Sequence, residues 1–560
     1  MFYEYKICGS CFWEGEVFNE NQLSKNIQKY SNALEKYRSN DRPVALRLSR
    51  GIRAVYCMVG LLERGIPFIN IDKNIPPQRV EYMLETVGAK YLITDLETRY
   101  EGVTVIQAEE LDAAVENIPE AGKFSDIAYY MCTSGTTGRP KAVKVLRSGL
   151  RNFFEGISDI FPFERQMRIA NITSYSFDIV FLELLFSLYN GLSVVLTSEE
   201  EVASVKSLMN IIEQNNIDIV QITPSRLRMI QLVDAELKCL DKVKFILIGG
   251  EAFPKELLPL LQKKTCRIFN MYGPTETTIW STVSELTKAE AVNVGRPILN
   301  TSIYIVDSDN KICEIGKEGE ICIGGEGLSA GYANNEDATK RAFIYLSENG
   351  VNERVYKTGD LGMLDSQGIL HCYGRLDNQI KLNGNRIELE DIDKNIMNTG
   401  LVSGAVTCLD REKNRLVTFY INDSLLDNAD LAERLRKTLP ETMIPKCYVK
   451  VEKFTYTISG KIDVRAMLAT VDSEDSTESG SVEDENKSVF WEVMKRYVTG
   501  PFDETSRLED LISDSIIFVQ MMVDFEDAYS FEFEAEALVE SNYPSVGDLY
   551  DYVRKLIPQS

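Results

Sequence analysis

The sequence predicts a layered α/β protein followed by a small α+β segment and a helical module. Strand-like and amphipathic helical runs alternate through the first 370 residues, a pattern typical of layered α/β structure. A run of Ser, Glu and Asp from 472 to 487 has almost no apolar content, which indicates a flexible linker. Apolar periodicity then returns from 489 to 557, as expected for a small helical bundle.

The elements of the α/β region can be predicted in chain order. Leu23, Ile27, Tyr30, Leu34 and Tyr37 recur at helical spacing, so this segment is expected to form an amphipathic helix. Strands are expected at 43–48, 91–94, 194–197, 217–222 and 244–248. Short strands and glycine turns around 313–325 predict a β-rich subdomain. A boundary is expected near 375–377, after a strand at 369–373, and a compact α+β segment then extends to about 468.

The charge of the chain restricts its partners. The composition is 44% hydrophobic and 26% charged, which is ordinary for a globular protein, and the net charge is −24. A nucleic acid or an anionic membrane is therefore not an expected partner. From residue 470 onward there are 22 acidic and 6 basic residues, a net charge of −16, which favours a separate acidic module at the end of the chain.

Cysteine and histidine usage excludes some kinds of site. The eleven cysteines are odd in number and most lie in apolar runs, as expected for reduced thiols in a cytoplasmic protein. Cys8 and Cys11 form a CxxC motif with no second pair or histidine nearby, so metal binding there is not expected. His371 is the only histidine and is expected to be structural, so a Ser-His-Asp triad is excluded.

No signal peptide or membrane span is predicted. The N-terminus lacks a basic start followed by an apolar core. The longest apolar region, 179–196, is interrupted by Glu183 and Asn190. A soluble cytoplasmic protein is expected.

A loop rich in hydroxyl groups is the most informative local feature. The apolar run 127–132 reads as a buried strand, and Thr133-Ser134-Gly135-Thr136-Thr137-Gly138-Arg139-Pro140-Lys141 follows it. Two glycines permit a tight bend, the hydroxyls offer donors and a lysine closes the run, so the loop suits polyphosphate oxygens. Its spacing differs from that of a P-loop. An ordinary Ser/Gly turn is the alternative.

Further motifs follow in a fixed order. They are Gly249–Ala252, Asn270–Thr278, Tyr356–Asp360, Tyr373–Asp377, Gln379–Glu388 and Thr457–Asp463. Each alone could be a turn or a solvated charge. Together with the loop 133–141 they resemble the adenylation domains of nonribosomal peptide synthetases, and also the D-alanine–carrier protein ligases of the teichoic-acid pathway. The resemblance covers about residues 5–468, and it departs from the family pattern at Ala142 and Asn383.

The resemblance implies an α/β layered adenylate-forming fold with a small α+β mobile lid, followed by a four-helix-bundle carrier. The implied domains are a core at 1–376, a lid at 377–468 with its hinge at Asp377, an acidic linker at 469–488 and a peptidyl carrier at 489–560.

The same resemblance assigns ATP-binding and catalytic residues. The ATP-binding set is Thr133, Ser134, Gly135, Thr136, Thr137, Gly138, Lys141, Gly250, Glu251, Tyr272, Thr275, Asp360 and Arg375. Tyr272 is expected against adenine, with Asp360 and Arg375 on the ribose. Lys461, Glu276 and Thr133 are the implied catalytic residues, with Glu276 holding Mg²⁺ and Lys461 reaching the substrate carboxylate. The substrate carboxylate and ATP are both anions, so attack of the carboxylate on the α-phosphorus requires that their charge be neutralised. A lysine, a metal ion and a loop of hydrogen-bond donors can do this.

The implied substrate is a small amino acid. In the family, the aspartate at the position of Asp178 pairs with the substrate ammonium, although an aspartate at a helix start could also be an N-cap. The implied pocket is Asp178, Ile179, Leu182, Gln221, Leu247, Gly249, Met271, Ile279, Trp280 and Lys461. This set resembles the glycine-selecting signature, with Met271 in place of leucine. L-Alanine or D-alanine is the alternative substrate, a plain apolar core is the alternative interpretation, and the alignment could slip by one residue at Gln221 and Leu247.

The acidic module resembles a carrier protein. Asp514 is expected to cap a helix whose first turn carries Ser515, the implied attachment site of 4′-phosphopantetheine. The paired glycines usual before Asp-Ser are replaced by Ile512 and Ser513. A phosphopantetheinyl transferase and a separate downstream condensation or acyl-acceptor enzyme are the implied partners. The expected reaction is ATP-dependent activation of glycine as glycyl-AMP and its transfer to the Ser515 arm as a thioester. A silent, non-catalytic carrier-presenting protein is the alternative.

Overall fold

The structure, a computed structural model, describes most of the first 455 residues and parts of the remainder. The described ranges are 6–112, 120, 122–133, 140–348, 351–376, 379–382, 385–410, 415–422 and 428–455, then 462, 464, 466–468, 471, 490–491, 493–494, 497–498, 502–512, 518, 521–522, 524–525, 533 and 543–556. The chain divides into two compact units. The first comprises Met1–Val202, Met209–Leu227 and Glu236–Asp391; the second comprises Ala203–Leu208, Arg228–Ala235 and Ile392–Ser560.

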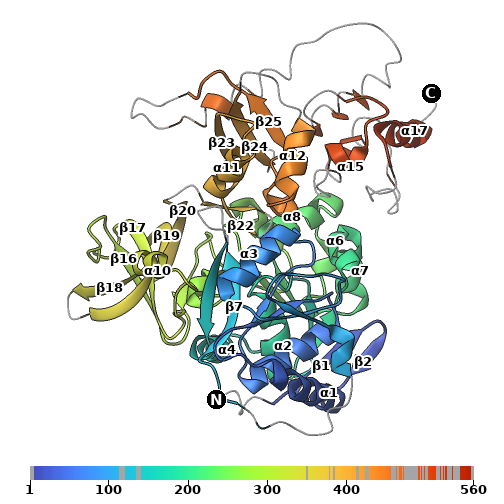
Figure 1. The fold of residues 1–560 in the computed structure, drawn as a ribbon. Coiled ribbons are helices and arrows are strands. Elements are labelled where there is room, and N and C mark those ends of the chain that lie inside the picture. The colour runs from blue at the N-terminus through green and yellow to red at the C-terminus, as the bar shows by residue number, and fades with distance from the viewer. Residues whose placement is uncertain are drawn as a thin grey trace, which may run out of the picture. The chain divides into compact units, whose positions relative to one another are not determined.

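A nine-stranded sheet forms one layer of the first unit (Figure 1). In spatial order its strands are β15 (Arg296–Pro297), β14 (Thr282–Glu285), β13 (Arg267–Tyr272), β12 (Phe245–Gly249), β11 (Ile219–Ile222), β9 (Arg168–Asn171), β10 (Ser193–Leu196), β1 (Ser10–Trp13) and β2 (Glu16–Phe18). Pairing is parallel from β1 to β13 and antiparallel at both edges. The central strands β11 and β12 are buried along their whole length and apart from Gln221 are apolar, as expected for parallel strands covered on both faces.

A six-stranded sheet forms a second layer. In order its strands are β6 (Thr104–Gln107), β5 (Tyr91–Thr94), β3 (Val44–Arg47), β4 (Phe68–Asn70), β7 (Ile127–Thr133) and β8 (Lys141–Leu146). Strands β7 and β8 pair antiparallel, so the two ends of the hydroxyl-rich loop, Thr133 and Lys141, lie opposite each other. The strands expected at 43–48, 91–94, 194–197, 217–222 and 244–248 are therefore confirmed, with ends shifted by up to two residues.

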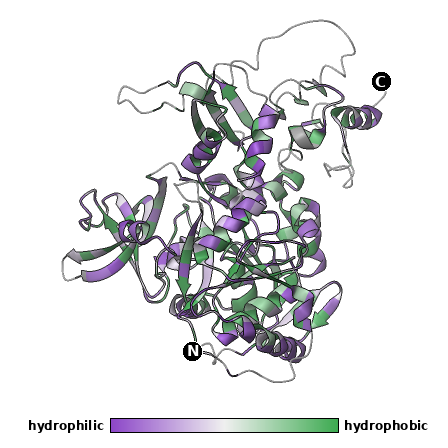
Figure 2. Cartoon of the chain, viewed as in Figure 1, coloured by the Kyte–Doolittle hydropathy of each residue, from purple (hydrophilic) through white to green (hydrophobic). Residues whose placement is uncertain are grey.

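Helices join and cover these sheets. They are α1 (Glu20–Leu34), α2 (Ile52–Arg64), α3 (Pro77–Val87), α4 (Arg147–Ile160), α5 (Ser187–Tyr189), α6 (Glu199–Ala203), α7 (Val205–Gln214), α8 (Pro224–Val233), α9 (Leu258–Leu261) and α10 (Glu336–Ala342), with a π-helical turn η4 at Leu182–Phe186. The expected first helix is α1, which Asn19 caps and which ends in a 3₁₀ turn at Glu35–Tyr37. Figure 2 shows apolar residues concentrated in the interior strands and polar ones along α1.

The expected β-rich subdomain is a five-stranded antiparallel sheet. Its strands are β16 (Thr301–Val306), β17 (Gly319–Gly325), β18 (Phe343–Glu348), β19 (Val351–Leu364) and β20 (Leu370–Arg375). The hairpin β21 (Gln379–Leu382) and β22 (Asn385–Glu388) follows. This hairpin belongs to the first compact unit, which extends to Asp391, beyond the boundary expected near residue 377. Within this unit Arg386 forms an ion pair with Glu276, and Asp391 forms one with Arg79.

The second unit contains a three-stranded sheet and part of the acidic module. The sheet is β23 (Gly404–Asp410), β24 (Arg415–Ile421) and β25 (Cys447–Lys450), accompanied by α11 (Leu389–Asn398) and α12 (Asn428–Arg436). In the acidic module, α15 (Leu508–Leu511) and α17 (Val546–Leu556) contribute to one apolar cluster with Phe490, Phe518 and Phe525. The four-helix bundle expected there stays a prediction.

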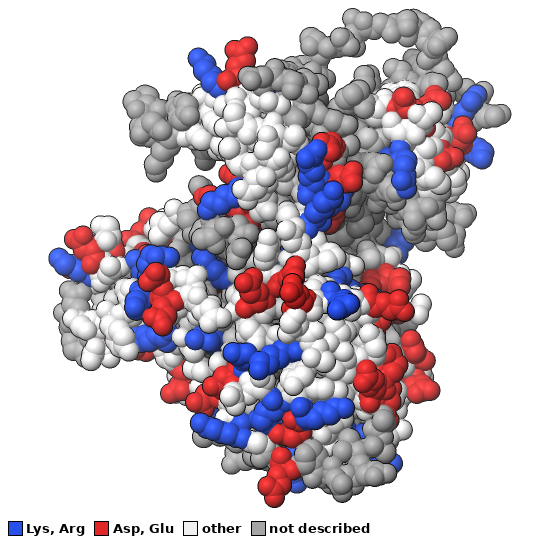
Figure 3. Space-filling view, viewed as in Figure 1, with Lys and Arg blue, Asp and Glu red and all other residues white. Residues whose placement is uncertain are grey.

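The described side chains show how the charged residues, the cysteines and the single histidine are arranged. Figure 3 shows acidic and basic side chains interspersed on the drawn face. All eleven cysteines are free thiols. His371 pairs with Asp365 at 3.1 Å, in keeping with a structural histidine. No helix among the described residues has the length and apolar character needed to cross a bilayer.

Candidate active site

Four of the residues implied as a substrate pocket share one face of the nine-stranded sheet. Gln221 on β11 pairs with Leu247 on β12, and Gly249 on β12 pairs with Met271 on β13. Paired residues and residues two apart along a strand point to the same side of a sheet. A slip of one residue would have sent any of them to the opposite face. The observed register therefore brings this set together.

Trp280 lies against the backbone of that face. A Cβ atom added at Gly249 would lie 2.6 Å from Trp280 Cη2 and 2.8 Å from the Met271 carbonyl oxygen, so only glycine fits there. Thr278 and Ile279 precede the indole with φ of 64° and 66°. Left-handed backbone is costly for β-branched residues and persists only where the surroundings enforce it, as happens at functional sites. This strained pair precedes the indole ring that lies over Gly249.

Asp178 is a buried carboxylate in the turn before η4. Its side chain is 7% exposed, and burial raises its pKa to about 6 although a hydrogen bond with Thr275 acts in the opposite direction. The Phe181 N–H donates to the backbone oxygen of Asp178, at 3.0 Å, rather than to the carboxylate. The described hydrogen bonds therefore do not make this side chain an N-cap.

The polar side chains of the implied pocket have atoms without a protein partner. Among its described residues these atoms are Asp178 Oδ2, Gln221 Nε2 and Trp280 Nε1, all buried. Buried polar atoms are normally hydrogen-bonded, and exceptions of this kind call for a ligand or a functional explanation. The remaining described members are apolar: Ile179, Leu182, Leu247, Met271 and Ile279 are buried or half-buried. The set fits a small ligand with polar groups and little apolar bulk.

The ends of the hydroxyl-rich loop point to a second cluster. Lys141 Nζ lies 5.7 Å from the centre of the Tyr332 ring. Burial lowers the pKa of Lys141, while Glu388 and Glu276 favour its charged form. Lys141 stands at the end of the loop whose sequence is rich in N–H and O–H donors, so its ammonium group is suited to bind a polyphosphate.

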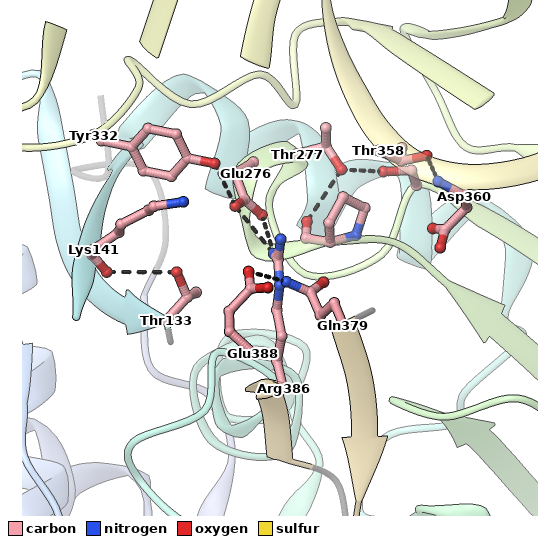
Figure 4. A network of polar contacts seen from close by, with 12 residues as sticks. Thr133, Lys141, Glu276, Thr277, Tyr332, Thr358, Asp360, Gln379, Arg386 and Glu388 are labelled. Carbon is pink, nitrogen blue, oxygen red and sulfur yellow. Dashed lines mark hydrogen bonds and ion pairs between the residues drawn. The ribbon is translucent and has the colours of Figure 1, made fainter. Parts of the chain in front are cut away.

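Glu276 is the centre of this second cluster (Figure 4). It lies in the 3₁₀ turn η7 (Thr275–Thr277) after β13 and is 1% exposed. Its carboxylate accepts hydrogen bonds from Tyr332 Oη at 2.8 Å and from Arg386 Nη1 at 3.0 and 2.8 Å. Burial would raise the pKa of Glu276, but Arg386 and Tyr332 outweigh it and the pKa is lowered. The expected metal ligand therefore has a cationic partner within the protein.

The residues expected around adenine and ribose also converge. Tyr272 Oη donates to Asp360 Oδ2 at 2.6 Å, and Arg375 Nη1 donates to Asp360 Oδ1 at 3.2 Å and to the Thr358 carbonyl at 2.6 Å. Asp360 and Arg375 are opposite each other on β19 and β20. Burial and the neighbouring Asp360 carboxylate raise the pKa of Tyr272 well above its ordinary value, so the phenol stays a donor.

The motif Gly249–Ala252 has a structural role as well. Gly250 has φ of 88°, which favours glycine. Glu251 Oε2 accepts from Ser225 N at 2.8 Å and from Ser225 Oγ at 2.6 Å, which satisfies the first turn of α8. An ATP contact by Glu251 stays a prediction beside this capping contact.

Several expected site residues lie outside the described part of the chain. They are Ser134, Gly135, Thr136, Thr137, Gly138, Asp377, Asn383, Lys461, Asp514 and Ser515. Their roles stay predictions.

Three residues of the candidate site and its surroundings were not predicted from the sequence. Arg386 lies in a motif that the sequence singled out, but no role followed for it. Tyr332 lies in no quoted motif and reaches Glu276 from a distant segment. Glu183 was noticed only because it interrupts an apolar run, and that interruption was itself a signal, since a lone buried carboxylate needs partners.

Comparison with known proteins gives a consistent set of relatives. A family model described as "AMP-binding enzyme" matches residues 11–333. The dimodular nonribosomal peptide synthase of Bacillus subtilis (strain 168) is 33% identical over 469 residues, which are 80% of this chain and 20% of that protein. The chain covers between 18% and 51% of the length of the first three curated relatives.

Two solved structures extend the likeness over nearly the whole chain. One is a holo nonribosomal peptide synthetase protein containing adenylation and PCP domains, bound to a vinylsulfonamide inhibitor. It is 22% identical with a TM-score of 0.81, covering 98% of this chain and 94% of its own. The other is a holo four-domain nonribosomal peptide synthetase bound to AMP and glycine, 26% identical with a TM-score of 0.62, covering 99% of this chain and 42% of its own. The α/β adenylate-forming fold that the sequence predicts is confirmed.

Proposed function

Because the chain belongs to the AMP-binding enzyme family, we propose that it activates glycine with ATP as glycyl-AMP and transfers the glycyl group to a phosphopantetheine thiol on Ser515. As a member of that family it is an adenylating ligase. The amino acid, the carrier site and the metal are the proposed part.

The residues on the face of the nine-stranded sheet support glycine as the substrate. Asp178 supplies a buried carboxylate for an ammonium group, and the indole of Trp280 fills the space over Gly249 where a side chain would project. A pocket rejects larger substrates by steric clash better than it rejects smaller ones. The neighbour solved with AMP and glycine, with which this chain shares 26% identity, supports the same choice.

The second cluster supports the ATP half of the reaction. Lys141 and the loop donors are proposed to hold the phosphates, with Tyr272, Asp360 and Arg375 around the nucleoside. Mg²⁺ is often held by one or two carboxylates together with substrate phosphates, so the single carboxylate of Glu276 fits it, provided that Arg386 withdraws. The metal would neutralise charge that develops on the phosphates.

The lid and carrier complete the proposal. We infer that residues 377–468 move about a hinge at Asp377 and bring Lys461 to the carboxylate, and that 489–560 carry the arm on Ser515. Such an arm needs a phosphopantetheinyl transferase to attach it and a downstream condensation or acyl-acceptor enzyme to use its thioester. The solved neighbour with adenylation and PCP domains supports this organisation.

Amino-acid-dependent exchange of pyrophosphate into ATP tests the activity. The expected result is exchange with glycine, weaker exchange with L-alanine and none with larger amino acids. Preference for D-alanine would instead favour a cell-wall type of pathway. Absence of exchange with every amino acid would contradict amino-acid activation and leave activation of another carboxylic acid, or a silent carrier-presenting protein.

Carrier loading needs its own test. The 560-residue chain, treated with a phosphopantetheinyl transferase and coenzyme A and then with ATP, Mg²⁺ and radiolabelled glycine, should retain acid-stable label that is released when the thioester is cleaved. Ser515→Ala should abolish that label and leave pyrophosphate exchange unchanged. Label that persists in Ser515→Ala would contradict the assignment of the arm.

A further inference from the structure

A chain of hydrogen bonds leads from the buried Glu183 through the half-buried Thr173 to the buried Gln221. Glu183 lies on η4 and has no exposed surface. Its Oε2 accepts from Asn171 Nδ2 at 2.8 Å and from Thr173 N at 3.0 Å, and its Oε1 lies 2.6 Å from Thr173 Oγ1. Thr173 Oγ1 is in turn 3.0 Å from Gln221 Oε1. A single hydroxyl thus links the carboxylate to the amide.

The hydrogens of this chain determine which way the amide faces. Thr173 has one hydroxyl hydrogen and cannot donate to both Glu183 and Gln221. The oxygen and nitrogen of a glutamine amide occupy equivalent positions, and the hydrogen-bond network decides between them. With the amide turned over, Gln221 Nε2 donates to Thr173 Oγ1 and Thr173 donates to Glu183. The buried Nε2 then gains the partner that it otherwise lacks.

The donors around Glu183 favour this direction. Burial raises the pKa of Glu183, and hydrogen bonds from Thr173 and the nearby Arg50 offset that rise only in part. Arg50 donates to the Thr173 carbonyl at 2.7 Å, and Arg226 donates to the Ile172 carbonyl at 3.3 Å. Both guanidinium groups interact electrostatically with the Glu183 carboxylate. Three donors directed at Glu183 suit an ionised group. A protonated Glu183 would donate to Thr173 and reverse the chain.

We propose that Glu183 and Thr173 are positioning residues that hold the Gln221 amide with its carbonyl oxygen toward the substrate pocket. Gln221 thereby presents an acceptor to the proposed pocket, to which Asp178 contributes its carboxylate, and both groups suit the N–H groups of an amino-acid ammonium. The inference rests on the proposed function and deepens it: selection of an amine over a hydroxyl would depend on a buried glutamate that does not touch the substrate.

Thr173→Val tests this in the full-length protein, because valine keeps the shape and removes the hydroxyl. Glycine and glycolate, which has a hydroxyl in place of the amine, are compared in pyrophosphate exchange. The expected result is an increase of about 10-fold in KM for glycine, the effect of one lost buried hydrogen bond, with little change in KM for ATP or in exchange with glycolate. Thr173→Ser should restore the wild-type KM. Glu183→Gln should lower the ratio of glycine to glycolate exchange at least as much as Thr173→Val.

Ser187→Ala is the matched control. The Ser187 hydroxyl is buried and donates to the Leu182 carbonyl at 2.9 Å, so this variant also removes a hydrogen bond of the same helical segment but leaves the chain to Gln221 intact. An unchanged KM for glycine in Thr173→Val, an equal loss for glycine and glycolate, or the same KM increase in Ser187→Ala would overturn the proposal. Wild-type protein that exchanges with no amino acid would overturn the proposed function itself, which is a separate outcome.

Discussion

The two halves of the candidate active site satisfy their buried polar groups in opposite ways. In the proposed amino-acid pocket, Asp178, Gln221 and Trp280 each keep a buried polar atom without a protein partner. In the nucleotide half, Glu276 is paired with Arg386 and Tyr332, and Asp360 is paired with Tyr272 and Arg375. The first half is held in shape by sheet register and a strained turn, and the second by contacts between charged groups.

The difference implies two modes of binding. A pocket of fixed shape with unpartnered polar atoms can gain ligand hydrogen bonds without giving up internal ones. A cluster whose carboxylates are already paired must exchange those partners for ligand groups, so binding there is coupled to movement of the residues that supply them. On this view the proposed amino-acid pocket determines which substrate is selected. Binding of ATP to the proposed nucleotide half would break and replace the ion pairs of Glu276 and Asp360.

The largest expected effect comes from removing the charge in the pocket. Asp178→Asn leaves the shape and removes the only described carboxylate with an unpartnered oxygen in the pocket. Loss of a buried partner for an ammonium costs about 3–5 kcal/mol, so kcat/KM for glycine should fall at least 100-fold. KM for ATP should change little. A comparable loss in KM for ATP would show that the two halves are not separable.

The pair Arg386–Glu276 offers the next largest effect, on stability. In the native protein the lowered pKa of Glu276 means that its carboxylate stabilises the fold above the ordinary carboxyl range, and this contribution is lost as pH falls through the lowered pKa. Arg386→Gln leaves the buried Glu276 carboxylate without its cation, so the pKa of Glu276 should rise above the ordinary carboxyl value. The ionised carboxylate would then destabilise the fold instead of stabilising it. The free energy of unfolding at pH 7 should fall by about 2–3 kcal/mol, less than for a fully buried pair because the Arg386 side chain is 21% exposed.

Two measurements check that expectation. The deficit of Arg386→Gln should shrink as the pH is lowered toward 4, because protonated Glu276 no longer needs a cation. Arg151→Gln is the control, since Arg151 pairs with Glu155 on α4 with both side chains more than a third exposed, and it should cost less than about 1 kcal/mol. Equal losses in both variants, independent of pH, would contradict an internal counter-ion for Glu276.

The sequence predicted the sheet half of the site better than the charged half. The alternating pattern predicted strands at the positions of β11 and β12, and the family resemblance implied Gln221, Leu247 and Gly249, which the observed register places on one face. Strained φ at Thr278 and Ile279 could not be read from residue types that normally avoid it.

The partners within the charged half were beyond the sequence for a different reason. Tyr332 and Arg386 are 56 and 110 residues from Glu276, and the pairing depends on how a sheet edge and a hairpin pack around it. The family resemblance implied that Glu276 holds a metal cation, but not that an arginine of the same chain forms an ion pair with it. Glu183 shows a signal that could have been used, since an isolated buried carboxylate requires donors.

A smaller effect should follow from reshaping the pocket. Trp280→Leu removes the ring that lies over Gly249 and opens space for a side chain. Because one methyl group in a fitted pocket is worth about 1–3 kcal/mol, the preference for glycine over L-alanine should fall by about 10- to 30-fold in pyrophosphate exchange. Leu232→Ala, at a side chain that is 40% exposed, is a control and should leave the ratio unchanged. An unaltered ratio in Trp280→Leu would show that the indole does not limit substrate size.

The smallest expected effect is a pH dependence confined to the pocket. Burial raises the pKa of Asp178 to about 6, so below that pH the carboxyl is neutral and lacks the charge that an ammonium needs. The value of kcat/KM for glycine should therefore fall about 10-fold for each unit below pH 6. At saturating glycine the fall in kcat should begin at lower pH, because the bound ammonium stabilises the ionised form and lowers the pKa of Asp178 in the complex. Asp178→Asn should lack this inflection while keeping any that belongs to ATP. If the same inflection persists in Asp178→Asn, it belongs to another group. The charge of Asp178 would then not distinguish the proposed amino-acid pocket from the nucleotide half.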